Sequence, residues 1–372
     1  MSIGKVDDNS SLLLTQDCGE LRSLFLSLKG DRDVALLLEV SYNRLKYHTS
    51  KASEKTRYKE FSIPKKSGGV RKILAPCTAV KILQRKLSQI LYSVYEPKQA
   101  VHGFVSSRSI LTNAEKHVRK RFVLNIDLED FFNTIHFGRV QGMFMKPPYN
   151  LPKEVAKVLA QICCCDGRLP QGAPTSPIVS NMICARMDSE LRKLAKACKC
   201  TYTRYADDIT FSTTLSKFPS GLANYTDGTD ISNIILGERL KLTIQGNGFE
   251  VNEDKTRLQH KSGHQGVTGL TVNQFPNVRR SFIREISSML YEWQKCIKLG
   301  TSIEERYEER QRKLLENSLQ ERPPFKENSS YKMPSFRQVL RGKIMFLGMI
   351  RGKQNSTYLT YLKWFNKLSQ KY

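Results

Sequence analysis

The sequence predicts an α+β protein with two or three subdomains. At 372 residues the chain is longer than a single hydrophobic core usually supports. Two β-prone runs, residues 201–203 and 209–211, flank a pair of aspartates, and a strand-like apolar run covers residues 121–126. Apolar residues recur at helical spacing over residues 78–95, and residues 280–372 have a helical pattern almost throughout.

The paired aspartates are Asp207 and Asp208, and their flanking strands place them at the tip of a tight hairpin. Adjacent carboxylates repel each other, and a bound cation relieves that repulsion. Carboxylate oxygens suit hard divalent metals, with Mg²⁺ first. The alternative is a solvated turn, because Asp is common in turns.

A third acid, Asp127, ends the apolar run of residues 121–126. Open sheets place ligand-binding groups at the carboxyl ends of their strands. If this strand lies beside the hairpin tip, Asp127 and Asp207 can hold a metal together. The alternative is a strand-end carboxylate in solvent, although Asp130, Phe131 and Phe132 crowd the same stretch.

The charge of the chain points to a polyanionic partner. Lys and Arg number 60 against 35 Asp and Glu, a formal net charge of +25, and the sequence pI is near 9.7. Nucleic acid is the first expectation and an acidic membrane surface the second. The sequence has no run of about 18 apolar residues, and its first residues lack the apolar core of a secretory signal. We therefore expect a cytoplasmic protein without membrane partners.

The nine cysteines follow no zinc-binding spacing, so reduced thiols are expected, which also fits the cytoplasm. Residues 11–60 are helical and basic by pattern. Residues 63–76 predict a hairpin around Gly68-Gly69 with Lys65, Lys66 and Arg71 on its arms. These cations could hold phosphates, Arg71 with a bidentate fork. The alternative is an edge hairpin that uses lysine against aggregation.

Two further segments have residue types that suit a nucleotide. Gln171-Gly172 stands before a helical pattern, and it offers a close backbone approach at a helix start. A Pro/Gly linker is the alternative. Lys255 could protonate a leaving pyrophosphate or stabilise its charge, although a lone lysine is commonly plain surface.

Polar residues in two other segments could contact nucleic acid. Asn113 and His117 lie on one face of a predicted helix, as they would in a capped structural helix. A later helix carries Arg337, Arg341 and Lys343 with aromatic residues downstream, a combination that suits RNA. Core aromatics with a basic outer face are the alternative there. The residues alone thus predict a polymerase-like enzyme with two metals, which activate a 3′-hydroxyl and stabilise pyrophosphate.

Over residues 60–275 the motifs, in order, resemble those of the reverse transcriptases. The matching blocks are Val70-Arg71-Lys72-Ile73, Asp127 with its paired Phe, residues 171–177, Tyr205-Ala206-Asp207-Asp208, and Gly248 to Lys255-Thr256. Residues 113–117 (Asn-Ala-Glu-Lys-His) and Val267-Thr268-Gly269 resemble the retron branch of that family.

This resemblance implies the right-hand polymerase architecture, with fingers, a palm built on an antiparallel sheet, and a helical thumb. We expect an N-terminal helical extension over residues 1–60. Interleaved fingers occupy residues 61–125 and 140–185. The palm comprises residues 122–139 and 186–275, and the thumb with its RNA-binding region residues 276–372.

The resemblance also implies roles for individual residues. Asp127, Asp207 and Asp208 would be the catalytic acids that bind two Mg²⁺ ions, Asp208 less directly, and Lys255 the general acid. The deoxynucleotide triphosphate would be bound by Lys65, Lys66, Arg71, Phe132 and Gln171, with Phe132 as the steric gate against a ribose 2′-hydroxyl. Contacts to RNA and primer would come from Asn113, His117, Val267, Thr268, Gly269, Arg337, Arg341 and Lys343.

The implied partners are a cognate non-coding RNA and its multicopy single-stranded DNA (msDNA), joined to the RNA through a 2′–5′ branch. An effector protein encoded nearby, host RNase H and a role in anti-phage defence are also expected. A group II intron-like or diversity-generating reverse transcriptase is the alternative enzyme, although an intron enzyme would need further domains for which the chain leaves no room. An RNA–DNA scaffold that holds an effector inactive is the alternative outside enzymes.

Overall fold

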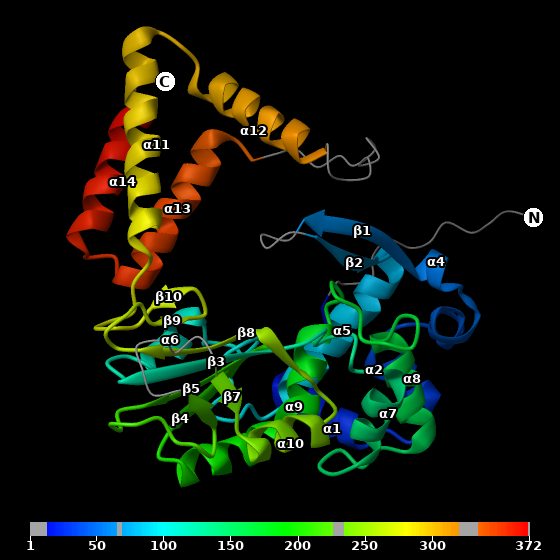
Figure 1. Ribbon diagram of the computed structural model, residues 1–372. Coiled ribbons are helices and arrows are strands. Elements are labelled where there is room, and N and C mark those ends of the chain that lie inside the picture. Colours follow the sequence, from blue (N-terminus) through cyan, green and yellow to red (C-terminus); the bar gives the residue numbers. More distant parts are fainter. Residues whose placement is uncertain (1–12, 65–68, 226–233, 320–333, 371–372) are drawn as a thin grey trace, which may run out of the picture. The chain divides into compact units, whose positions relative to one another are not determined.

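The computed structural model of the chain describes residues 13–64, 69–225, 234–319 and 334–370 (Figure 1). The chain divides into two compact units, Met1–Thr268 and Gly269–Tyr372. The first unit contains the four-stranded sheet, and the second consists mainly of helices.

The four-stranded sheet is antiparallel and has the strand order β4-β5-β3-β8 (Figure 1). Its strands are β3 (Phe122–Leu128), β4 (Thr201–Tyr205), β5 (Asp208–Thr213) and β8 (Val251–His260). β4 and β5 form the hairpin predicted around the aspartate pair, with Tyr205 opposite Asp208. β3 is the predicted apolar strand that leads to Asp127, and it lies between β5 and β8.

The two faces of this sheet differ in chemistry, because successive side chains alternate between faces. Leu124 and Ile126 of β3 and Ile209 and Phe211 of β5 belong to the main hydrophobic core. The opposite face presents polar side chains, and Asn125 donates a 3.3 Å hydrogen bond to Thr210 there. Asp127 and Asp208 lie on this polar face, at its end.

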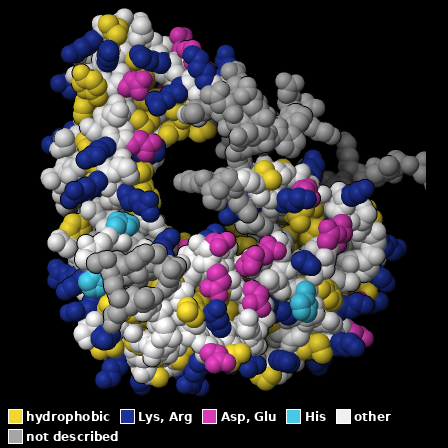
Figure 2. Space-filling model, in the orientation of Figure 1, with side chains coloured by type: hydrophobic (Ala, Val, Ile, Leu, Met, Phe, Trp, Pro, Cys, Tyr) yellow, Lys and Arg dark blue, Asp and Glu magenta, His cyan; other side chains and the backbone are white. Residues whose placement is uncertain are grey.

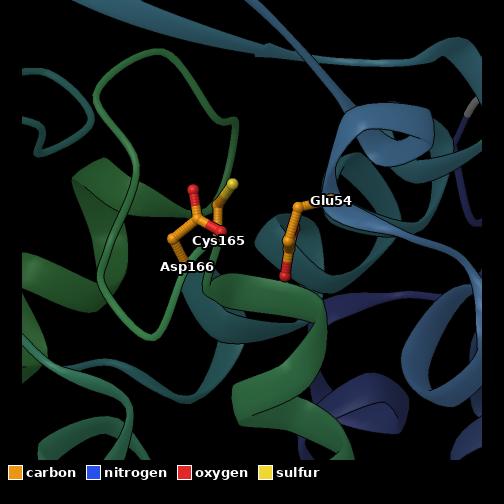
Figure 3. Close-up of side chains that lie close together, drawn as sticks. All are labelled: Glu54, Cys165 and Asp166. Carbon is orange, nitrogen blue, oxygen red and sulfur yellow. The ribbon is translucent and has the colours of Figure 1, made fainter.

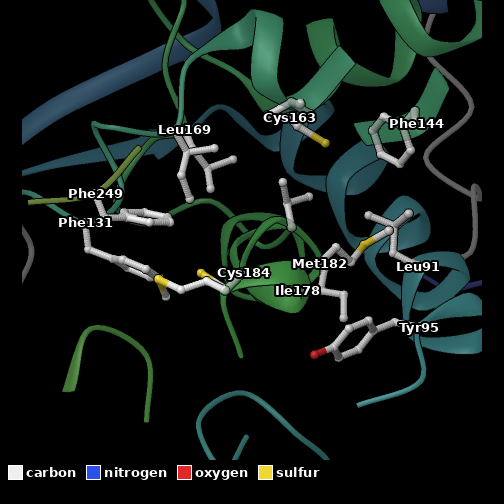
Figure 4. Packing of buried hydrophobic residues seen from close by; sticks show 14 of the residues in the cluster. Leu91, Tyr95, Phe131, Phe144, Cys163, Leu169, Ile178, Met182, Cys184 and Phe249 are labelled. Carbon is white, nitrogen blue, oxygen red and sulfur yellow. The ribbon is translucent and has the colours of Figure 1, made fainter. Parts of the chain in front are cut away.

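Helices of the first unit enclose the core face of the sheet. The central one is α9 (Ser176–Ala197), whose residues Ile178, Met182 and Cys184 are part of the same core (Figure 4). The others are α5 (Thr78–Val94), α7 (Phe137–Met145), α8 (Lys153–Cys163) and α10 (Glu238–Gly246), whereas α6 (Ile110–Glu115) contributes no residue to this core and contacts β4 instead. The helical pattern predicted over residues 78–95 is thus confirmed as α5.

The N-terminal part is helical over most of the predicted residues 11–60, and it leads into a hairpin whose first strand already begins at Tyr58. It contains α1 (Cys18–Leu26), α2 (Asp31–Leu37), α3 (Tyr42–Lys46), the π-helix η1 (Tyr47–Lys51) and α4 (Glu54–Arg57). β1 (Tyr58–Pro64) and β2 (Val70–Pro76) then pair antiparallel, with Pro64 opposite Val70. This pairing confirms the predicted hairpin, whose positions 65–68 lie outside the described residues.

Short strands complete the first unit and begin the second. β6 (Ala223–Tyr225) pairs with β7 (Ile234–Leu236), and β9 (Gly266–Val267) pairs with β10 (Leu270–Thr271). The helices of the second unit are α11 (Arg280–Leu299), α12 (Ile303–Leu319), α13 (Phe336–Arg351) and α14 (Ser356–Ser369). Buried Trp293 of α11 packs edge-on against Phe336 and Phe365, so an aromatic cluster joins α11, α13 and α14.

None of the helices in the described part of the chain has the length and the apolar run that crossing a bilayer requires. Lys and Arg side chains cover much of the face seen in Figure 2, and acidic side chains gather in the middle of the first unit. All nine cysteines are free thiols, as expected.

Candidate active site

Three aspartates meet at one end of the central sheet. Asp127 of β3 is the register partner of Asp208, the first residue of β5. Asp207 belongs to the two-residue turn between β4 and β5, and its carbonyl accepts a 3.1 Å hydrogen bond from the Leu128 amide. The structure therefore brings together the three acids that the sequence predicted as metal ligands.

Lys255 lies beside these acids, because β8 departs from regular pairing with β3. The register between these strands shifts between Asn125 and Asp127, where Asp127 pairs with Asn252. Within the irregular stretch the Asn252 side chain accepts a 3.3 Å hydrogen bond from the Lys255 amide. The Lys255 ammonium then lies 2.7 Å from Asp127 Oδ1.

Burial and repulsion from neighbouring carboxylates raise the pKa values of Asp207 and Asp208. Burial is the main cause of a raised pKa at Asp207, and the charge of Asp127 adds to it, whereas Lys255 and Arg71 oppose it. The pKa of Asp208 is raised to about 6, mainly by burial and then by the charges of Asp207 and Asp127. The positive charges of Arg257 and Lys255 oppose this rise. A bound divalent cation would relieve this repulsion.

The donor set fits Mg²⁺, because three half-buried carboxylates supply hard oxygen ligands at one sheet end. In the described part of the chain, a different group of three has its ligand atoms within 4.8 Å of one another: Glu54, Cys165 and Asp166 (Figure 3). Arg57 already pairs with Glu54 at 3.1 Å. Burial raises the pKa of the Cys165 thiol, which keeps it protonated. The aspartates therefore fit a metal ion better than this group does.

The predicted nucleotide-binding residues approach the acids from two elements. Exposed Arg71 of β2 is close enough to Asp207 for its charge to lower the pKa of that carboxyl. The carbonyl of Gln171 accepts a 3.0 Å hydrogen bond from Leu74 of the same strand. A Cβ on Gly172 would lie 2.9 Å from the Ile73 side chain, so this close docking requires glycine. Lys65 and Lys66 lie outside the described residues.

The two adjacent phenylalanines occupy different environments. Phe131 is buried and stacks on Phe249 at a centroid distance of 5.5 Å (Figure 4). Phe132 is partly exposed and contacts Phe131 and Phe104 at 5.2 and 6.3 Å. Only Phe132 of this pair reaches the surface, which is what a steric gate requires.

His117 and Asn113 are buried rather than exposed. The two ring nitrogens of His117 each lie 2.7 Å from a hydroxyl, Ser212 of β5 and Thr203 of β4. Burial lowers the pKa of His117 to about 3, so the ring is neutral. Asn113 is also enclosed, and its side-chain amide has no hydrogen-bond partner within the described part of the chain. The structure does not support direct RNA contact by the His117 ring, which braces the two catalytic strands instead.

The second retron-like block also differs from the expectation of an exposed contact. Val267 is fully buried, so its side chain is not available to RNA or primer. The Thr268 hydroxyl donates a 3.3 Å hydrogen bond to the Ile110 carbonyl of α6. Gly269 is exposed and has a left-handed φ of 83°. Of this block, Thr268 and Gly269 keep surface that a nucleic acid could contact.

The three predicted cations of α13 are not equivalent. Lys343 pairs with Glu285 of α11 at 3.0 Å, and Arg337 lies 3.7 Å from Glu304 of α12. Arg341 is exposed, and the described residues offer it no ion pair. The stretch of α13 lacks acids, but other helices supply them, which the sequence pattern of one helix does not reveal.

Sequence reasoning missed Arg257, whose charge lowers the pKa of Asp208. Arg257 lies opposite Asn125 on β8, so its side chain is on the polar face that carries the acids. The alternation Lys255-Thr256-Arg257, which the structure places in β8, was the available signal.

Comparison with known proteins agrees with this geometry. The sequence profile of the family described as "Reverse transcriptase (RNA-dependent DNA polymerase)" matches residues 63–298. The retron Mx65 reverse transcriptase of Myxococcus xanthus is 37% identical over 286 residues, which are 70% of this chain and 62% of that protein. The retron Ec73 reverse transcriptase of Escherichia coli is 33% identical over 229 residues, 58% of this chain and 68% of that protein.

The chain spans about three fifths of the length of its Myxococcus xanthus relatives, 62% for retron Mx65 and 58% for retron Mx162. A solved telomerase from Candida albicans aligns with 84% of this chain and 63% of its own, at 13% identity and a TM-score of 0.42. The family match confirms the predicted fold class, α+β of the right-hand polymerase kind. The chain therefore belongs to the reverse transcriptase family and, within it, to the retron-type reverse transcriptases.

Proposed function

We propose that this chain is an RNA-directed DNA polymerase that copies part of a cognate structured RNA into msDNA. The observation that carries the proposal is the convergence of Asp127, Asp207 and Asp208 at one sheet end, with the Lys255 ammonium 2.7 Å from Asp127. Buried acids with raised pKa values are typical of a site built to hold cations.

Asp127 and Asp207 would hold two Mg²⁺ ions, with Asp208 as the less direct ligand. The chemistry that the bound ions supply is activation of the attacking hydroxyl and neutralisation of the charge on the leaving pyrophosphate. The carboxylates lie at the ends of two paired strands. Such a rigid support would reduce the entropy cost of orienting the reactants.

The cations and the aromatic ring around the acids would bind and select the nucleotide. Lys255 lies beside the acids and would act as the general acid for pyrophosphate. Arg71 would bind the triphosphate, and its influence on the pKa of Asp207 supports that position. Phe132 would exclude a ribose 2′-hydroxyl, because it is the exposed member of the phenylalanine pair.

The retron assignment extends the proposal to the partners. The cognate partner would be a structured non-coding RNA, and the product would be DNA joined to it through a 2′–5′ linkage. We also propose an effector protein, removal of copied RNA by host RNase H, and a role in anti-phage defence. The identity to proteins named as retron reverse transcriptases and the formal charge of +25 support these partners.

Extension of a DNA primer on an RNA template by the purified chain tests the polymerase. Extension should require Mg²⁺ and deoxynucleotides and should vanish in an Asp207→Ala, Asp208→Ala double variant. Lys255→Ala should slow single-turnover incorporation by roughly 10²-fold or more.

Lys241→Ala is the matched control, because Lys241 forms an ion pair of the same 2.7 Å length with Glu253, and neither residue is among those that shift the pKa values of Asp207 and Asp208. It should leave the rate unchanged. Extension that survives in the double aspartate variant would refute the assigned site.

A further inference from the structure

The guanidinium of Arg204 lies completely buried beneath the catalytic turn. Its Nε and Nη2 donate to the two carboxylate oxygens of Asp188 on α9, at 2.7 and 2.8 Å. The third nitrogen, Nη1, donates a 3.0 Å hydrogen bond to the carbonyl of Ala206. Tyr202 also donates to Asp188, at 2.7 Å, so the acid that anchors Arg204 is itself held.

Ala206 needs such support, because its backbone is in the left-handed region with φ of 56°. This conformation is strained for residues other than glycine and persists where the surroundings enforce it. Arg204 binds the Ala206 carbonyl, and Gly103 lies against its amide. A Cβ on Gly103 would lie 2.4 Å from the Ala206 nitrogen, so the turn is enclosed on both sides.

One side chain ties these two sides together. Asn181 of α9 accepts a 3.2 Å hydrogen bond from Arg204 Nη2 and donates one of 2.9 Å to the Gly103 carbonyl. The backbone of Arg204 bonds to the same loop, through Ala100 and His102, at 2.8 Å each. The helix that carries Asn181 and Asp188 begins at Ser176, next to the block that contains Gln171.

We propose that Arg204, anchored by Asp188 and Asn181, is a positioning residue that holds Ala206 in its left-handed conformation and thereby aims Asp207 and Asp208 at Asp127. Arg204 is buried and acts only through the turn. The proposal rests on the proposed function, because it presumes that the aspartates bind the metal ions.

The competing explanation is that Arg204 and Asp188 form a buried ion pair that has no effect on the turn. The variant Arg204→Lys distinguishes this explanation from the proposal. Lysine keeps the positive charge for Asp188 but lacks the planar fork that reaches Asp188 and Ala206 together. Arg57→Lys is the matched control, since Arg57 is also buried, pairs with Glu54 at 3.1 Å and donates to the Gln161 carbonyl at 2.6 Å.

The test combines Mn²⁺ binding by electron paramagnetic resonance, hydrogen exchange of the 204–208 peptide, melting temperature, and the split between kcat and nucleotide KM. Arg204→Lys should weaken Mn²⁺ binding about tenfold, speed exchange and lower kcat by roughly 10- to 100-fold at little-changed KM. Adding Ala206→Gly should partly restore Mn²⁺ binding, slow hydrogen exchange and kcat, because glycine adopts left-handed φ without strain. Arg57→Lys should lower the melting temperature only.

The proposal would be overturned if Arg204→Lys lowered the melting temperature as Arg57→Lys does but left Mn²⁺ binding and hydrogen exchange unchanged. It would also be overturned if adding Ala206→Gly to Arg204→Lys restored neither Mn²⁺ binding nor slow hydrogen exchange nor kcat. The binding and exchange measurements need no polymerase activity. A wild-type chain that fails to extend primers would therefore refute the proposed function, while these measurements would still decide the role of Arg204.

Discussion

Phe132 is the residue whose surroundings most directly predict substrate selection. It is partly exposed and follows Asp127 by five residues, while its neighbour Phe131 is buried against Phe249. Phe132→Ala should raise ribonucleotide incorporation relative to deoxynucleotide by roughly 10- to 100-fold, the range that steric discrimination in a pocket provides. Steady-state kcat/KM for both nucleotides measures the ratio.

Phe131→Leu is the control, because this change lies in the core and should lower thermal stability without altering sugar selection. An unchanged ratio in Phe132→Ala would place the gate elsewhere.

Asp208 makes the metal-free protein sensitive to pH. Its pKa of about 6 lies above the ordinary value of 3.8, so between these values the native state binds more protons than the unfolded state. The free energy of unfolding should therefore fall as the pH rises from about 4 to about 6. The cost above pH 6 is on the order of 2–3 kcal/mol, since one pKa unit corresponds to about 1.4 kcal/mol.

Asp208→Asn should remove this cost. Chemical unfolding in a metal chelator should show the variant more stable than wild type at pH 8 and about equal to it at pH 4. Adding Mg²⁺ should stabilise wild type more than the variant. A variant that is equally stable at pH 8 would show that Asp208 carries no such repulsion.

At the scale of elements, helix α13 divides its cations between packing and surface. Lys343 pairs with Glu285 at 3.0 Å, whereas Arg341 is exposed. Arg341→Gln should weaken binding of a structured RNA and reduce the slope of log affinity against log salt by about 1, the loss of one phosphate contact. Fluorescence anisotropy at several salt concentrations gives the slope.

Lys343→Gln serves as the comparison from the same helix. It should leave the slope unchanged and cost about 1 kcal/mol or less of stability, as for a largely surface ion pair. Equal slopes for wild type and Arg341→Gln would remove Arg341 from the RNA contact.

At the scale of the whole molecule, local patterns predicted what depends on neighbours in sequence. The aspartate hairpin follows from the β-prone residues around Asp207, and Asp127 was identified because an apolar strand ends there. The burial of His117 depends on Thr203 and Ser212, about 90 residues away, and pairing of Lys343 depends on another helix. Such contacts are set by tertiary packing, which a local pattern does not encode.

The boundaries of fingers, palm and thumb stay predictions. The two compact units meet at Thr268 and Gly269, near the predicted thumb start at residue 276. The Arg204–Asp188 pair was likewise invisible in the sequence, because nothing about either residue alone distinguishes a buried partner from a surface charge.

The most direct test of the account is extraction of nucleic acid from cells that express the chain together with its native upstream DNA. The wild type should yield a short single-stranded DNA that migrates freely only after debranching, and the Asp207→Ala, Asp208→Ala variant should yield none. Primer extension on RNA without any branched product would contradict the retron assignment. A branched product made by the double variant would contradict the catalytic site.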